Sequence, residues 1–117
     1  MSELDQALAS LRGHAGVEHV LVLGRDGLLI QHSGDGDLDV ETVSAMVPEI
    51  ASAASGFGVA AERGEVSTVV MRFRDGVAVV DVLSSDLLLA VLLREGVGFA
   101  PLLRDLARDR ARLASLV

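Results

Sequence analysis

The chain has 117 residues, of which 50% are apolar and 3% aromatic, and its formal net charge is −7. This length suits one domain, residues 1–117, with a hydrophobic core of its own. An acidic surface repels phosphate backbones, and the scarcity of aromatic side chains leaves no base-stacking surface, so we expect no nucleic-acid partner. The absence of cysteine excludes disulfides, thiolate catalysis and zinc–cysteine sites.

Three features predict a cytoplasmic protein without a membrane partner. No uncharged run approaches the roughly 18 residues that a transmembrane helix requires. The N-terminal segment MSELDQALAS carries acidic residues where a signal peptide would carry positive charge followed by an apolar run. The absence of cysteine also fits a reducing compartment.

The first third of the chain predicts one helix and one β-hairpin. Residues Ser2–His14 combine an acidic first turn with an apolar stripe, which indicates a short amphipathic helix. Val17–Leu23 and Leu28–Ser33 are rich in apolar residues, and Asp26-Gly27 stands between them. Because glycine tolerates the positive φ that a tight turn needs, this pair predicts a hairpin.

The longest predicted helix, Asp39–Glu62, carries apolar residues on two neighbouring faces. Pro48 falls inside it, and an interior proline disfavours a helix by about 3 kcal/mol, so we expect packing on both faces to stabilise it. One row, spaced by seven, comprises Met46, Ala53 and Ala60 and suits contact with another helix. The broader face, predicted to cover a sheet, comprises Val40, Val43, Val47, Ile50, Ala54, Phe57 and Ala61.

Three strands and a last helix are predicted after the long helix. The third strand, Glu65–Phe73, alternates in polarity, which suits a sheet edge or a subunit boundary. It leads through a second Asp-Gly turn, with the chemistry of the first, into Val77–Leu83. This strand and the next, Leu87–Leu93, are apolar on both alternations, so both of their faces should be covered. The last helix spans about Phe99–Leu116.

These elements predict an α+β fold, a three-layer α/β/α sandwich. Its five-stranded antiparallel sheet is built in the order helix–ββ–helix–βββ–helix. The long helix is expected on one face of the sheet and the two terminal helices on the other.

Few residues suggest catalysis, so we expect no enzyme, no metal and no cofactor. His14, His19 and His32 lie in different predicted elements without the spacing of metal ligands, which favours solvated or structural roles. The acidic segment 34–39 resembles a calcium loop only superficially, because the mid-loop glycine and the terminal acid are missing. The sequence has no phosphate-binding GxxxxGK[ST] motif.

Two groups of charged residues allow a structural and a functional interpretation. Asp81 interrupts an apolar strand but has no evident acid or histidine partner, which favours a structural or edge-facing group over a catalytic one. Arg104, Arg108 and Arg112 repeat every four residues and could contact an acidic partner or offer an arginine finger. A solvated face with intrahelical ion pairs is the more common outcome for such a row.

Three local motifs add to the element order. The segment GVEHVLVLGRDGLLIQHSGD places Gly16-Val17 at a strand entry and Arg25–Leu28 in a turn. An alanine-rich long helix follows, and Arg74–Gly76 forms a turn before a valine-rich strand. Together these features resemble the Roadblock (dynein light chain) family in its bacterial form, over almost the whole chain. The resemblance implies the profilin-like Roadblock fold.

The resemblance also implies a non-enzymatic homodimer that regulates or scaffolds a small Ras-like GTPase. In the family, the long helix packs against its twofold mate and the third strands adjoin in a continuous sheet. Bacterial members commonly partner such GTPases, and this chain is shorter than members that stimulate GTP hydrolysis, so a scaffold or regulator is expected. The implied dimer interface comprises Met46, Ile50, Ala53, Ala60, Val66, Thr68, Val70 and Arg72.

Two alternatives stay open at this point. A small-molecule-sensing module of similar fold requires an apolar cavity with polar groups, near Asp81 or His19, although the predicted sheet faces are filled by leucine and valine. A general scaffold is the other alternative. The sequence also leaves open whether the chain pairs with itself or with a paralogue.

Overall fold

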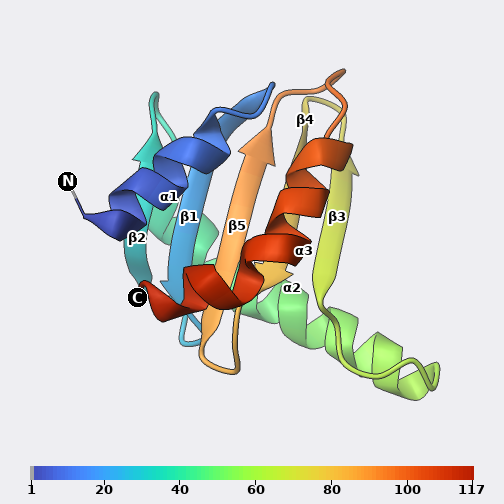
Figure 1. Cartoon of the computed structure of the whole chain (residues 1–117). Helices are drawn as coiled ribbons and strands as arrows, with labels where there is room; N and C mark the ends of the chain where they lie inside the picture. Colours follow the sequence, from blue (N-terminus) through green and yellow to red (C-terminus); the bar gives the residue numbers. More distant parts are fainter. Residues whose placement is uncertain (1) are drawn as a thin grey trace.

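Five antiparallel strands form one sheet in the order β2–β1–β5–β4–β3 in the computed structural model, which describes residues 2–117 (Figure 1). The strands are β1 (Val17–Gly24), β2 (Leu29–Gly34), β3 (Thr68–Phe73), β4 (Gly76–Val82) and β5 (Leu87–Leu93). The helices are α1 (Glu3–Arg12), α2 (Val40–Ala60) and α3 (Ala100–Ser115). The predicted fold class and element order are confirmed.

Local sequence determines where α1 and α2 begin. The Ser2 hydroxyl accepts a hydrogen bond from the Asp5 N–H at 3.0 Å, and the Asp5 carboxylate accepts one from the Ser2 N–H at 3.2 Å, which makes a capping box. Asp39 caps α2 by accepting from the N–H of Thr42 at 3.2 Å. Pro48 lies inside a continuous α2, so the helix persists despite the lost hydrogen bond.

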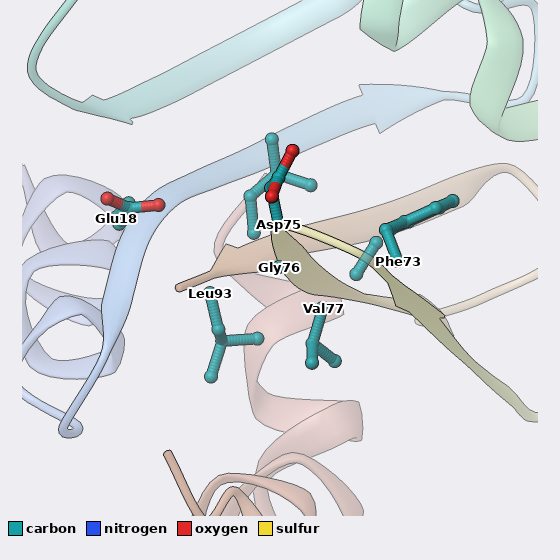
Figure 2. Close-up of a pocket in the computed structure, with 8 residues that line it drawn as sticks. Glu18, Phe73, Asp75, Gly76, Val77 and Leu93 are labelled. Atoms are coloured by element: carbon teal, nitrogen blue, oxygen red, sulfur yellow. The ribbon is translucent and has the colours of Figure 1, made fainter. Parts of the chain in front are cut away.

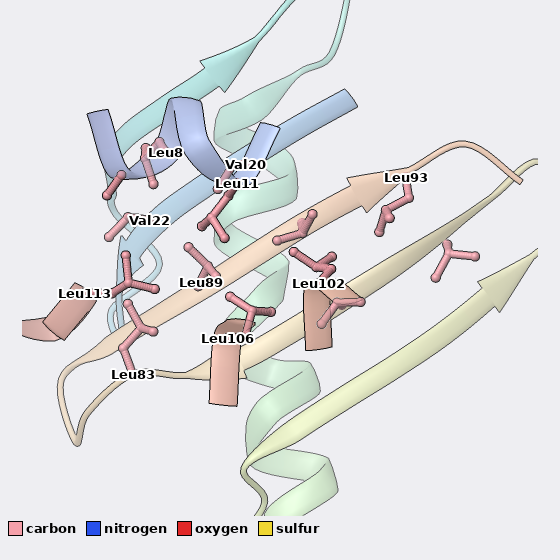
Figure 3. Packing of buried hydrophobic residues seen from close by; sticks show 14 residues of the cluster. Leu8, Leu11, Val20, Val22, Leu83, Leu89, Leu93, Leu102, Leu106 and Leu113 are labelled. Atoms are coloured by element: carbon pink, nitrogen blue, oxygen red, sulfur yellow. The ribbon is translucent and has the colours of Figure 1, made fainter. Parts of the chain in front are cut away.

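Each face of the sheet carries a hydrophobic core, and the two cores differ in size. On one face α1 and α3 bury Leu8, Leu102 and Leu106 against the strands (Figure 3). On the other face α2 contributes only Val47 and Ala51 to the buried apolar cluster. The predicted layers are therefore confirmed, but the α2 layer covers its face less completely.

The two Asp-Gly turns differ, although the same chemistry was predicted for both. Gly27 has a φ of 86°, the left-handed conformation that glycine adopts without strain. Gly76 instead begins β4 and has no positive φ, so the prediction is wrong there. A Cβ at Gly76 would lie 2.8 Å from the carbonyl oxygen of Leu93, so glycine is needed for close approach to β5. The turn between β3 and β4 consists of Arg74 and Asp75.

Candidate protein interface

Much of the apolar surface of α2 faces solvent. By length and composition this helix is apolar enough to cross a membrane, yet only 17% of its 18-residue apolar window is buried within the protein. The last buried residue is Ala51, and the second half of α2 runs past the β3 edge of the sheet (Figure 1). Phe57 was predicted to cover the sheet but is 77% exposed, and Ala61 is exposed as well. Both predictions are wrong because the sheet ends before the helix does.

An apolar groove of about 170 Å³ lies between the first half of α2 and the sheet. Met46, 55% exposed, and Ile50 line its helix side, and Phe73, 59% exposed, lies on its sheet side. The remaining lining residues are Val43, Val47, Met71, Ala78, Val80, Ala90 and Leu92. Because every lining residue is apolar, the groove suits the apolar side chains of a protein partner.

Strand β3 forms a regular, unpaired edge of the sheet. Its register with β4 has no shift from Thr68 to Phe73. Antiparallel pairing alternates along a strand, and the hydrogen bond from the Val82 N–H to the Ser67 carbonyl, 2.9 Å, defines which residues face β4. The backbone groups that point away from β4 consequently belong to Thr68, Val70 and Arg72.

The opposite edge, β2, is less suited to pairing. The register between β1 and β2 shifts at Val22/Leu23, which indicates a bulge or irregularity there. Bulges twist an edge and interrupt its row of hydrogen-bonding groups, which protects it from adding another strand. Of the two edges, β3 is therefore the better one for strand addition.

The predicted interface residues lie on two adjacent surfaces. On α2, Met46, Ala53 and Ala60 are exposed, and Ile50 is half-buried in the groove. The spacing of seven residues thus places the row of Met46, Ala53 and Ala60 on the solvent side of α2.

On the strand side, Val70 is 40% exposed and Arg72 is exposed, with its guanidinium 5.2 Å from the centre of the Phe99 ring. Val66 precedes β3, which begins at Thr68 rather than at the predicted Glu65. The two surfaces meet where α2 passes the β3 edge (Figure 1).

Beneath this edge, Arg110 of α3 holds the fully buried carboxylate of Asp81. The guanidinium donates from Nε to Oδ2 at 3.0 Å and from Nη2 to Oδ1 at 2.9 Å, and Thr68 Oγ1 donates to Oδ1 at 2.7 Å. Hydrogen bonding to Asp81 raises the pKa of Arg110 above its ordinary value. Asp81 is therefore a buried structural group and not an edge-facing one. Its partner was missed because Arg110 lies outside the predicted arginine row.

The predicted row of arginines is exposed on α3, and Arg108 and Arg112 line a hollow between α3 and α1. Arg104 and Arg112 are exposed. Arg108 pairs through Nη2 with Asp105 and with Asp109, at 3.0 Å in each case. The hydrogen bonds with Arg108 lower the pKa of Asp109. The intrahelical ion pairs expected for a solvated face are present.

The structure also brings His19 and His32 together, a contact that the sequence interpretation missed. Nδ1 of His19 lies 3.1 Å from Nε2 of His32, and the rings stack with centroids 5.3 Å apart. Burial, then the neighbouring His19 and Arg12, lower the pKa of His32. Within residues 2–117 no group of three or more His, Cys, Asp or Glu side chains is arranged to hold a metal ion. The pair is thus a contact between β1 and β2.

The sequence matches one family model over most of its length. That model, the Roadblock/LC7 domain, aligns with residues 3–93. The chain belongs to the Roadblock/LC7 family. This Roadblock domain has α1 to β5 within the matched range, whereas α3 lies beyond it.

Several solved structures share this Roadblock fold. "MglB with tetrameric arrangement" is 16% identical with a TM-score of 0.87, over 97% of this chain and 86% of that chain. A Roadblock/LC7 domain from Streptomyces avermitilis is 22% identical with a TM-score of 0.85, over 97% of both chains. MglC from Myxococcus xanthus is 17% identical with a TM-score of 0.67, over 97% of this chain and 98% of that chain. At these identities the likeness concerns the fold. No curated protein matches the chain in sequence.

Proposed function

We propose that this Roadblock protein is a non-enzymatic homodimeric adaptor or regulator whose dimer interface is formed by α2 and the β3 edge. The observation that carries the proposal is the exposure of α2, a helix as apolar as a membrane span of which only 17% of the apolar window is buried. Contiguous exposed apolar surface of this kind is typical of an interaction site. The cover that we propose for it is a second copy of the chain.

Pairing of two β3 edges would be symmetric about Val70. The residues whose backbone groups point outward are Thr68, Val70 and Arg72, and they are evenly spaced. In an antiparallel twofold pair, Val70 faces its own copy, and Thr68 faces Arg72 of the second copy. Each of these pairs exchanges two backbone hydrogen bonds, so the five-stranded sheets join into one of ten strands.

The same twofold axis gives the overhanging half of α2 a place to pack. The second half of α2 leaves the sheet past β3 (Figure 1). In the proposed dimer this half extends over the sheet of the second copy. The groove beside Met46 and Ile50 lies open on that face. Phe57 and Val59, both more than half exposed in the monomer, are the apolar side chains available to fill it.

The dimer is tested by sedimentation equilibrium of the purified protein, with Met46→Arg as the disrupting variant. We expect a dimer at micromolar concentration and a dissociation constant raised at least about 30-fold by the substitution, because a charge would be placed in a desolvated apolar contact. A wild-type protein that stays monomeric and binds phospholipid vesicles would identify α2 as a membrane contact and overturn the proposal. A monomer without vesicle binding would overturn it as well.

We infer further that the regulated partner is a small Ras-like GTPase. The support is the chain's membership of the Roadblock/LC7 family, together with its resemblance to the bacterial form of that family, which implies a partner of this kind. Calorimetric titration of the dimer with a Ras-like GTPase encoded beside its gene, loaded with GDP or with a GTP analogue, tests this inference. We expect the dimer to bind the GTPase in one of the two nucleotide states. Absence of binding in both states contradicts the inference.

The alternative of a small-molecule sensor is weakened by the state of Asp81. A ligand cavity needs polar groups that are free to orient the ligand. The Asp81 carboxylate is instead engaged by Arg110 and Thr68. A thermal-shift screen of metabolites and nucleotides that yields a reproducible stabiliser would restore the sensor as a candidate.

A further inference from the structure

A second hollow, of about 320 Å³, lies at the end of the sheet where β3 turns into β4 (Figure 2). Glu18 lies on one side of it and Asp75 on another, and Phe73 adds an exposed aromatic ring. The other lining residues come from the ends of β4 and β5: Gly76, Val77, Ala78, Leu92 and Leu93. The hollow thus combines an apolar floor with two carboxylates.

Neither carboxylate is neutralised within the monomer. Among residues 2–117, the side chains of Glu18 and Asp75 take part in no ion pair and no side-chain hydrogen bond. Glu18 is also the extra residue of an irregularity between β1 and β5, where Val17 pairs with Leu93 but His19 pairs with Leu92. A bulge re-aims a side chain, and here it gives the hollow its second negative charge. A cationic group with an apolar stem is the complementary ligand.

The tip of α2 presents such a group. The helix ends in a Schellman-type turn, in which the N–H of Arg63 donates to the carbonyl of Gly58 at 2.7 Å and the N–H of Glu62 donates to that of Val59 at 3.0 Å. Glu62 adopts a left-handed φ of 58°, which is uncommon for a residue other than glycine. The turn holds the backbone of Arg63 at the end of the overhang. Within residues 2–117, its exposed guanidinium has only a long contact of 3.5 Å, with the Glu62 carbonyl.

The register of the proposed dimer brings the tip and the hollow together. With Val70 on the twofold axis, the segment before Thr68 lies beside the segment after Arg72 of the second copy. Arg63 lies five residues before Thr68, where β3 begins, and Asp75 lies two residues after Phe73, where β3 ends. In Figure 1 the tip of α2 leaves the sheet at the end where β3 begins, opposite the end that carries the β3–β4 turn.

We propose that Arg63 of each protomer inserts into the Glu18/Asp75 hollow of the second copy, with its stem against Phe73 and its guanidinium between the carboxylates. The contact rests on the proposed dimer and deepens it, because it fixes the register of the two chains. It occurs twice in a symmetric dimer, so each substitution acts twice. Like charges placed at the contact then repel at both copies.

Charge reversal tests the contact by sedimentation equilibrium of the full chain. Arg63→Glu and Asp75→Arg are each expected to raise the dissociation constant of the dimer about tenfold or more. The double variant R63E/D75R should restore it to within about threefold of wild type, since the pair is reformed with opposite polarity. Arg104→Glu, an exposed arginine on α3, is the matched control and should have no such effect. Circular dichroism of each variant checks that it folds, and Arg63→Gln supplies a milder change.

The outcomes separate the contact from the dimer. A wild-type dimer whose dissociation constant responds equally to Arg63→Glu and Arg104→Glu, or whose single variants are not rescued in combination, overturns the contact and leaves the dimer standing. A wild-type protein that is monomeric overturns the dimer and the contact together. Rescue by the double variant supports both.

Discussion

The two faces of the sheet differ in how far the chain itself covers them. On the α1/α3 face, two helices bury leucines against the strands, and an ion pair from α3 reaches a carboxylate within the sheet. On the α2 face, one helix contributes two buried apolar residues and leaves a groove open beside it. The chain therefore closes one face of its sheet and leaves the other open.

The difference lies in the direction of the covering helices. α1 and α3 lie over the strands for most of their length, whereas α2 crosses the sheet and continues beyond β3 (Figure 1). An overhanging helix loses part of the burial that stabilises it, and α2 also contains Pro48, Gly56 and Gly58. Such a helix gains most from a partner that covers its free half. The closed face thus holds the monomer together, and the open face is available for assembly.

The largest expected effect comes from the closed face. Arg110→Ala removes the partner of a carboxylate that is 0% exposed, and it leaves Asp81 with only the Thr68 hydroxyl. An uncompensated buried charge costs about 3–5 kcal/mol in the free energy of unfolding. Urea denaturation measures this loss. The contrast variant Asp81→Asn removes the buried negative charge itself, so it should lower the free energy of unfolding by less. Equal losses for the two variants would contradict the buried-charge explanation.

A second effect compares leucine and methionine on opposite faces. Leu106→Ala in the closed core should lower the free energy of unfolding by about 3 kcal/mol, because it removes buried methyl groups and leaves a cavity. Met46→Ala on the open face should act through the proposed dimer. Its effect on the denaturation midpoint should therefore shrink as the protein is diluted, whereas that of Leu106→Ala should persist. A concentration-independent loss for Met46→Ala would mean that the open face already packs within the monomer.

The closed face could be predicted from sequence more completely than the open one. Apolar periodicity, strand-forming residues and turn signals assigned every helix and strand its type, and the order of these elements placed the helices on the correct sides. Periodicity specifies the face of a helix but not the point where the sheet beneath it ends, so Phe57 was assigned to a core that stops at Ala51. The row of Met46, Ala53 and Ala60 was recognised because apolar residues, one flexible and two small, repeat every seven positions on a second face.

Contacts between distant residues could not be predicted in this way. Asp81 and Arg110 are 29 positions apart and lie in a strand and a helix, so their pairing depends on how α3 crosses the sheet. The contact of His19 with His32 is easier to predict than that of Asp81 with Arg110. Both belong to the predicted hairpin, but the irregular register between β1 and β2 hides which residues face each other.

A third effect compares two exposed alanines, one on the helix of the open face and one on a helix of the closed face. Ala53 on α2 and Ala107 on α3 are both exposed helical residues. Ala53→Arg should raise the dissociation constant of the proposed dimer about 30-fold, corresponding to about 2 kcal/mol, because a long charged side chain would enter the proposed helix contact. Ala107→Arg should leave it unchanged. Sedimentation equilibrium of the two variants decides the matter, and equal values would move the interface away from α2.

The smallest expected effect is a pH dependence at the edge of the α2 face, where His32 stacks on His19 with Arg12 and Asp35 nearby. Burial first, then His19 and Arg12, lower the pKa of His32 below its ordinary value of 6.5. The unfolded chain therefore binds a proton at a higher pH than the folded chain does. The contribution of His32 to the free energy of unfolding is fully present above pH 6.5. It is lost as the pH falls from 6.5 through the lowered pKa of His32 in the folded state.

Urea denaturation at pH 7.5 and pH 5.0 measures this loss, and His32→Gln should diminish the difference between the two values. Asp5 and Asp39 have pKa values below the ordinary 3.8, so their contribution begins only at more acidic pH. An undiminished pH difference in the variant would assign the dependence to another group. The histidines join β1 and β2, away from β3, so the dissociation constant of the proposed dimer should change little in His32→Gln. This result would show that the β2 edge of the open face affects stability without belonging to the proposed interface.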